Sequence, residues 1–182
     1  DVYKRQDLTV GFERSAGRVG VKVSADMTEL DFADGISTTG TKVENDDRDR
    51  TEMVYGGELS YTAPADLQFY TAGNFTAIDY DVEGGVADRD SDGYEVRIGA
   101  RKRISNRLRT EGYVGYLRRD FDGSGLETVD TPTFGFNMLS MLTSRTSVEF
   151  DIERTIQETT LTNLSANVST RYTVKAQHAI QD

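Results

Sequence analysis

The chain has 182 residues, of which 36% are hydrophobic, and it carries a formal net charge of -10 with no cysteine. No stretch approaches the roughly 20 apolar residues that a membrane-spanning helix needs, so a helical membrane protein is excluded. The acidic balance argues against nucleic acid as a partner, because neutralising phosphates requires a basic surface. Disulfides and thiolate metal sites are also excluded, and the 9 tyrosines and 8 phenylalanines argue against disorder.

Apolar residues recur with period two, the period of a β-strand, over unusually long segments. Residues 1–6 do not join this pattern and are set apart as a candidate non-native end, which leaves one predicted domain over residues 7–182. The first two strands are predicted over residues 8–15 and 18–32. They lead into a long loop at 33–50, which is rich in Thr, Gly and Asp.

The rest of the chain repeats this plan of long strands, tight turns and polar loops. Proline in the Pro64-Ala65-Asp66 turn pre-sets the backbone of the first tight turn after the long loop. Seven further strands are predicted over residues 51–63, 67–81, 93–104, 108–121, 131–142, 146–157 and 164–176. Loops are predicted over residues 82–92, 122–130 and 158–163, and tight turns over 105–107 and 143–145.

The turn lengths predict how neighbouring strands align. A three-residue turn between Ile104 and Leu108 would place Arg101 opposite Glu111, which is an opposite-charge pair. The same turn length in the two other hairpins aligns apolar side chains, namely Tyr61 with Phe69, Met138 with Phe150, and Phe136 with Ile152. Because such cross-strand pairs stabilise a sheet, their recurrence under one turn length supports this register.

Strand length, loop asymmetry and face chemistry together indicate a membrane barrel. Soluble strands average about 5–6 residues, whereas a tilted membrane strand needs about 9–11, and most of the predicted strands reach that length. Tight turns alternate with longer loops, as periplasmic turns and extracellular loops do in outer-membrane barrels. One strand face is apolar and aromatic, and the other carries charges of both signs. The sequence leaves open which face is inside.

The predicted fold class is therefore all-β, an antiparallel up-and-down transmembrane β-barrel in the cell outer membrane. Nine strands is an odd number, whereas single-chain bacterial barrels close with an even number, so we expect a partial barrel, a fragment of a larger one. If the short turns are periplasmic, an aromatic girdle near the outer interface would contain Tyr94, Tyr116, Phe121 and Phe134.

Several segments resemble a known family. They are DRDSDGYEVRIGARKRISNRLRTEGYVGYLRRDFDG at Asp88 to Gly123, RDRTE at Arg48 to Glu52, and ERTIQETTL at Glu153 to Leu161. In these segments the chain resembles the bacterial outer-membrane family described as putative beta-barrel porin 2. The resemblance implies a complete barrel longer than this chain and, since some members occur with exopolysaccharide or capsule export systems, a channel for a glycan.

The charged strand face supplies the candidate pore-lining residues. They are Glu52, Glu58, Glu95, Arg97, Arg101, Arg103, Glu111, Glu149, Asp151, Glu153, Arg171 and Lys175.

Two groups within this set have alternative interpretations. Arg97, Arg101 and Arg103 could form a track for an anionic glycan, although ion pairing with Glu111 is the favoured interpretation. The carboxylates at 149, 151 and 153 could do acid–base work, but ion pairing with Arg171 or Lys175 on the next strand is favoured. No catalytic residue is predicted.

Three aspartates resemble the opening of a calcium loop. Asp88, Asp90 and Asp92 follow the pattern D-x-D-x-D-G. The position that should supply a bidentate glutamate is Gly99, and no helices are predicted around the loop. A solvated acidic turn is therefore the favoured interpretation, with calcium as the alternative, and no metal or cofactor is predicted.

The leading functional hypothesis is a porin-like outer-membrane channel linked to exopolysaccharide or capsule export, without enzymatic activity. Its expected partners are outer-membrane lipid and lipopolysaccharide, with exopolysaccharide as a candidate and no nucleic acid. Two alternatives are a structural or adhesive outer-membrane barrel with a plugged lumen and a soluble β-barrel that binds a small molecule.

Overall fold

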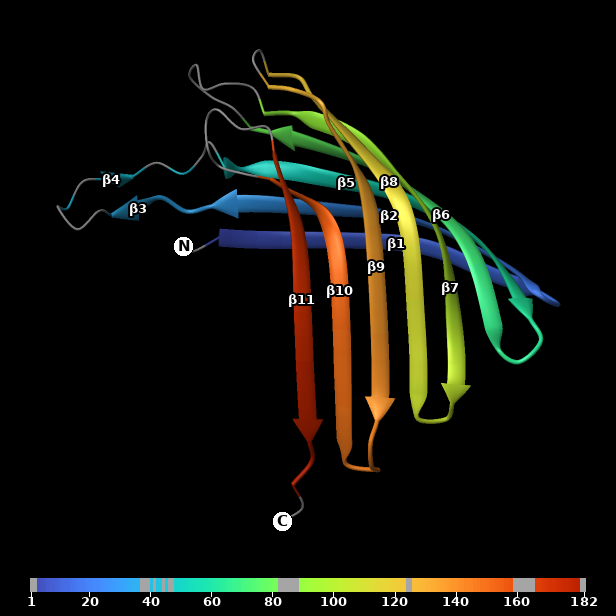
Figure 1. Cartoon of the computed structure of the whole chain (residues 1–182). Helices are drawn as coiled ribbons and strands as arrows, with labels where there is room; N and C mark the ends of the chain where they lie inside the picture. Colours follow the sequence, from blue (N-terminus) through green and yellow to red (C-terminus); the bar gives the residue numbers. More distant parts are fainter. Residues whose placement is uncertain are drawn as a thin grey trace.

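The computed structural model of the chain describes residues 3–36, 40, 42–43, 45, 48–81, 89–123, 126–158 and 166–180. These residues form a nine-stranded sheet in which successive strands pair antiparallel, as predicted, and the sheet does not close (Figure 1). Its strands are β1 (Tyr3–Ala16), β2 (Val19–Phe32), β5 (Arg50–Ala63), β6 (Leu67–Tyr80), β7 (Ser91–Ser105), β8 (Leu108–Phe121), β9 (Val129–Met141), β10 (Thr146–Glu158) and β11 (Ala166–His178). The described residues include no helix long and apolar enough to cross a membrane.

The first strand begins earlier than the apolar alternation predicted. β1 starts at Tyr3, because Tyr3 to Gln6 pair with residues at the end of β2. The Tyr3 and Phe32 rings lie 5.3 Å apart, and Lys4 forms a 3.1 Å salt bridge with Asp31. Polar side chains interrupt the alternation at this end of the hairpin, although the backbone pairing continues.

The predicted loop at 33–50 contains a short ribbon that the sequence did not indicate. β3 (Gly35–Ile36) pairs antiparallel with β4 (Lys42–Val43). A 2.7 Å salt bridge between Lys42 and Asp34 ties the base of this ribbon. Residues 82–88 and 159–165 lie outside the described residues. They cover parts of the predicted loops 82–92 and 158–163 and the start of the predicted strand 164–176.

The predicted cross-strand register is confirmed in all three hairpins. Arg101 is paired with Glu111, and the partners of Tyr61, Met138 and Phe136 are those expected. The predicted turn at 105–107 is wrong in detail. Ser105 pairs with Leu108 across a two-residue turn, and the register shifts between Arg103 and Ser105. This shift is a β-bulge, which inserts one extra residue into β7. The extra residue compensates for the shorter turn, so Arg101 and Glu111 are still paired as predicted.

The two faces of the sheet differ in chemistry and in exposure. We call the face that carries Glu58, Arg101 and Glu111 the polar face, and the face that carries Ile98 and Val114 the apolar face. Ile98 and Val114 are 60% and 58% exposed, whereas Tyr70 and Thr133 on the polar face are 6% and 2% exposed. Side chains converge and cover one another on the inside of a curved sheet. The strands swing from β1 and β2, which run across the view, to β9–β11, which run down it (Figure 1). The polar face is therefore the concave one.

Charged residues bound the apolar face at both ends of β7. Asp92 marks the end next to the long loops and Lys102 the end next to the tight turns, with uncharged residues between them on this face. Ten residues at about 3.4 Å each, tilted by about 40°, rise about 26 Å. This height matches the apolar band of about 25 Å that surrounds outer-membrane barrels.

The structure places three of the four residues of the predicted aromatic girdle together, while their position at a membrane interface stays a prediction. Tyr94, Tyr116 and Phe134 lie on the apolar face, in the halves of β7, β8 and β9 nearer to the long loops. Phe121 does not belong with them, because its register partner is Ser91 and its side chain falls on the polar face. The sequence grouped Phe121 with the others by its distance from the loop and did not consider strand parity, which assigns it to the opposite face.

Candidate functional site

The polar face gathers every charge that the sequence singled out as pore-lining. The strand registers place all twelve residues on this face, although their role in a pore stays a prediction. They are Glu52 and Glu58 on β5, Glu95, Arg97, Arg101 and Arg103 on β7, Glu111 on β8, Glu149, Asp151 and Glu153 on β10, and Arg171 and Lys175 on β11.

Arg101 is the centre of the tightest network on the polar face. Its two terminal nitrogens donate to the two carboxylate oxygens of Glu58, at 2.7 and 2.8 Å, and its Nε lies 3.1 Å from Glu111. The guanidinium also stacks 4.0 Å from the centre of the Tyr70 ring, and Tyr70 donates a 2.8 Å hydrogen bond to Glu111. Two-pronged arginine–carboxylate pairs are among the strongest charge-assisted hydrogen bonds. The favoured pairing of Arg101 with Glu111 is confirmed, and Glu58 is a partner that the sequence did not identify.

Glycine makes room for this network. The Tyr70 ring lies over Gly99 on the neighbouring strand, where an added Cβ would come within 2.6 Å of the ring. Tyr113 lies over Gly135 in the same way, and an added Cβ there would collide with the Tyr113 ring. Each tyrosine therefore lies flat against the sheet because its neighbour has no side chain.

A second network of similar design surrounds Arg97. Its guanidinium lies 5.1 Å from the centre of the Tyr113 ring and its Nε 3.6 Å from Glu95. Thr133, which is almost fully buried, donates a 2.8 Å hydrogen bond to Glu95. The pairing of Arg97 with Glu111 suggested by the sequence is wrong, because Glu95 is the carboxylate that faces it. The two arginine–tyrosine stacks thus hold guanidinium groups against the concave surface of the sheet.

The carboxylates of β10 are paired only in part. Lys175 lies 3.7 Å from Glu149, as expected from the sequence, and Asn137 lies within hydrogen-bonding distance of Glu149 and Asp151, at 3.3 and 3.5 Å. Arg171 stands opposite Glu153 in the register, but no salt bridge joins these two described residues. The three carboxylates thus line the wall of the polar face and show no organised acid–base pair.

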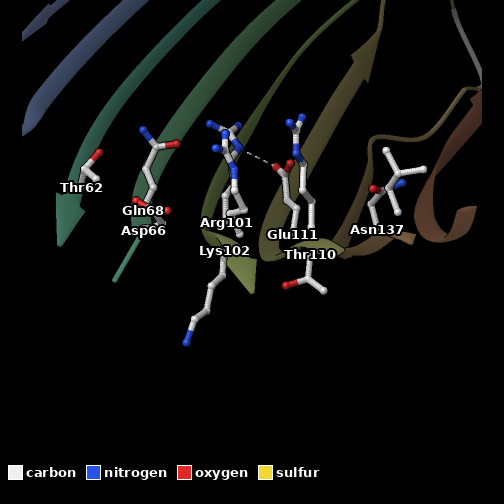
Figure 2. Close-up of a pocket in the computed structure, with 11 residues that line it drawn as sticks. Thr62, Asp66, Gln68, Arg101, Lys102, Thr110, Glu111 and Asn137 are labelled. Carbon is white, nitrogen blue, oxygen red and sulfur yellow. Dashed lines mark ion pairs between the residues drawn. The ribbon is translucent and has the colours of Figure 1, made fainter. Parts of the chain in front are cut away.

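A depression of ≈ 420 Å³ hollows the polar face near the tight turns of β5–β6 and β7–β8. Figure 2 shows the Arg101–Glu111 ion pair within it, with Gln68 and Asn137 on either side. Arg103 and Arg109 also line it, and they are register partners of each other. Arg109, Tyr70, Tyr113 and Thr133 were missed by sequence reasoning, although strand parity alone would have placed them on this face.

The structure describes two of the three aspartates of the candidate calcium loop. Asp88 lies outside the described residues. Asp90 accepts a 2.7 Å hydrogen bond from the backbone nitrogen of Tyr80, and Asp92 belongs to β7. Within the described residues, no group of three or more His, Cys, Asp or Glu side chains is arranged to hold a metal ion.

Comparison with known proteins identifies the family. No curated protein and no solved structure matches the chain. The model of the family described as putative beta-barrel porin 2 matches residues 1–182, so the match includes the first hairpin, which the sequence resemblance reached only through its strand pattern. The open antiparallel sheet, with an apolar convex face and a charged concave face, fits a barrel wall. The chain belongs to the putative beta-barrel porin 2 family.

Proposed function

We propose that this chain forms part of the wall of an outer-membrane β-barrel channel for hydrophilic solutes. One observation carries the proposal: the convex face exposes large apolar side chains, while charged side chains such as Arg101 and Glu58 lie half-buried on the concave face. A soluble barrel has a dry interior and a wet exterior, and a membrane channel has the reverse arrangement. The apolar band of about 26 Å between Asp92 and Lys102 supports contact with lipid.

The chemistry of the polar face suits the passage of polar solutes. Arg101 and Arg97 lie stacked on tyrosine rings and beside carboxylates, so these side chains have partners within the wall itself. Charges of both signs and amide groups such as Asn137 offer hydrogen bonds along its length. A passive channel is the function that such a wall supports best.

A complete channel needs more than these nine strands. β1 and β11 are the two edges of the sheet, and among the described residues neither has a second partner strand. Unpaired backbone groups cannot face lipid, so further strands must cover both edges in a membrane. These strands belong either to the same polypeptide or to another copy.

The specific solute that we propose is a polysaccharide on its way out of the cell. The resemblance to a family some of whose members accompany exopolysaccharide or capsule export supports this choice. The partners would then be outer-membrane lipid and lipopolysaccharide around the apolar band and a glycan against the polar face. A structural barrel with a plugged lumen is the second candidate, and the salt bridges of Arg101 with Glu58 and Glu111 favour it, since they leave these charges internally satisfied.

Conductance separates these possibilities. The intact protein, purified in detergent and added to a planar lipid bilayer, is expected to give stepwise conductance and to migrate differently on gels before and after heating. Membrane insertion without conductance would favour the plugged barrel. A soluble monomer that needs no detergent would contradict both.

A further inference from the structure

Two arginines on the polar face stand directly opposite each other. Arg103 on β7 and Arg109 on β8 are register partners, and both are exposed. Neither forms a salt bridge within the described part of the chain, whereas Arg97 and Arg101 on the same strand both do. Like charges directly opposite on a sheet destabilise it, so this pair is costly to the fold on its own.

The surroundings of the pair do not neutralise it. Both arginines line the depression of ≈ 420 Å³ beside the tight turns. The acidic residues that share this depression are Asp66 and Glu111. Glu111 is already occupied by Arg101 and by the Tyr70 hydroxyl, and Asp66 forms no salt bridge with a described residue. The depression is thus an electropositive spot in a chain whose formal net charge is -10.

Local backbone geometry helps to create this arrangement. The β-bulge lies between Arg103 and Ser105, immediately after the first arginine of the pair. Bulges bend a strand and re-aim the side chains beside them. Hydrogen-bonding groups of Thr62, Gln68 and Asn137 line the rest of the depression. A guanidinium presents a planar fork of donors that matches a carboxylate or a phosphate.

We propose that Arg103 and Arg109 form a binding site for oxyanion groups, carboxylate or phosphate, of a solute that enters the lumen from the turn side. Binding itself rests on the depression and on two arginines that form no salt bridge with a described residue, whereas the passage of this solute rests on the proposed channel function. With the tight turns in the periplasm, an exported polyanion would meet this site first. A bound anion would relieve the repulsion between the two arginines, which favours its binding.

Direct binding to the intact, detergent-solubilised protein tests the site. The probes are tetragalacturonate, which carries one carboxylate on each sugar, inorganic phosphate, and neutral maltotetraose, followed by calorimetry. The double variant Arg103→Gln and Arg109→Gln is expected to weaken anion binding by at least roughly ten-fold, because charge-assisted hydrogen bonds are lost. The control carries Arg14→Gln and Arg107→Gln, which remove the same charge outside the depression and should leave anion binding unchanged.

A charge reversal guards against the trivial explanation that the variants misfold. Arg109→Glu should form a cross-strand salt bridge with Arg103, so that anion binding is lost while the unfolding temperature is retained or raised. Preference for tetragalacturonate over phosphate would identify the carboxylate as the recognised group, and the reverse preference would identify phosphate. Maltotetraose binding equal to that of tetragalacturonate, or double-variant binding equal to that of the wild type, would overturn the proposal.

Conductance in planar bilayers separates failure of the site from failure of the channel. The double variant should conduct but with a lower anion-to-cation permeability ratio than the wild type and the control. Anion binding by a protein that does not conduct would support the binding site and contradict the channel function. Conductance with the same permeability ratio in all three proteins would contradict the binding site and support the channel function.

Discussion

Single glycines decide whether the arginine–tyrosine stacks of the polar face can exist. Tyr113 can lie against the sheet because Gly135 on the next strand has no side chain, and Arg97 then rests on the tyrosine ring. Tyr70 and Gly99 provide the same arrangement beneath Arg101. Glycine normally weakens a strand, so its place here is explained by the close approach of a ring and not by backbone propensity.

Replacing Gly135 with alanine should therefore destabilise the protein through Tyr113. The added Cβ would displace the ring and with it the stack on Arg97, at a cost of about 1–3 kcal/mol. Urea unfolding of the intact protein in micelles measures this cost. The matched control is the same glycine substitution in a Tyr113→Ser background, where the cost should largely disappear. Equal costs in the two backgrounds would show that the ring does not occupy this space.

Most of the sheet was predictable from the strands themselves. Period-two alternation located the strands of the sheet, and turn length alone aligned Arg101 with Glu111 and Met138 with Phe150. The start of β1 at Tyr3 and the β3–β4 ribbon could not be predicted, because polar and apolar side chains do not alternate there. Nor could the bulge near Ile104, since a three-residue turn and a two-residue turn with a bulge give the same register beyond it.

The candidate site was predictable as a face but not as a set of contacts. The alternation of side chains along each strand placed all the candidate pore-lining residues on one face. Arg101, however, binds Glu58 on β5, across the intervening strand β6. The strand register of a hairpin predicts only the residues that lie directly opposite each other. On a concave face, however, the long side chain of an arginine can reach a residue two strands away. Which face is concave also depends on how the whole sheet curves, and the sequence contains no local signal for that.

Two substitutions on β5 test which face meets the lipid. Leu59 lies on the apolar face and is 52% exposed, and Val54 lies on the polar face opposite Asp26. Leu59→Lys should destabilise the protein in lipid vesicles by about 2–4 kcal/mol, because a lysine would face hydrocarbon. Val54→Lys should be tolerated, because its ammonium would face water and Asp26. Urea unfolding in vesicles measures both, and the opposite ranking would mean that the faces are assigned the wrong way round.

The β3–β4 ribbon should loosen in acid. The hydrogen bond from Lys42 to the Asp34 carboxylate holds the pKa of Asp34 below its ordinary value of 3.8. A carboxyl whose pKa is lowered on folding stabilises the folded form above its unfolded pKa, and this contribution is lost as the pH falls through the folded pKa. The ribbon should therefore stay ordered at neutral pH and open below about pH 3.8.

A nitroxide label at exposed Ile36 measures this opening. Its mobility should rise as the solution is acidified, and in Lys42→Met it should be high at every pH. The Lys4→Met variant, which breaks the separate salt bridge to Asp31, is the control and should titrate like the wild type. A label whose mobility does not depend on pH in the wild type would contradict the role of this salt bridge.

At the scale of the whole molecule, strand direction limits how the barrel can close. The nine strands alternate in direction, so β1 and β11, the first and the ninth, run the same way. They cannot join as antiparallel neighbours, and bacterial single-chain barrels close with an even number of antiparallel strands. The convex apolar band nevertheless continues to both edges, with Val10 on β1 and Val174 on β11 exposed. We therefore expect further strands to lie between β1 and β11 in a closed barrel.

Cysteine cross-linking in the membrane-inserted intact protein tests this conclusion. These 182 residues contain no cysteine, so no native thiol among them can react with the cross-linker. Val21→Cys with Leu59→Cys, which are register partners, should be joined by a short bismaleimide, because neighbouring strands lie about 5 Å apart. Val10→Cys with Val174→Cys should not be joined within one molecule, because other strands lie between β1 and β11. An efficient intramolecular link at this second pair would mean that the two edges meet in a parallel seam, and the nine strands would then form the whole barrel.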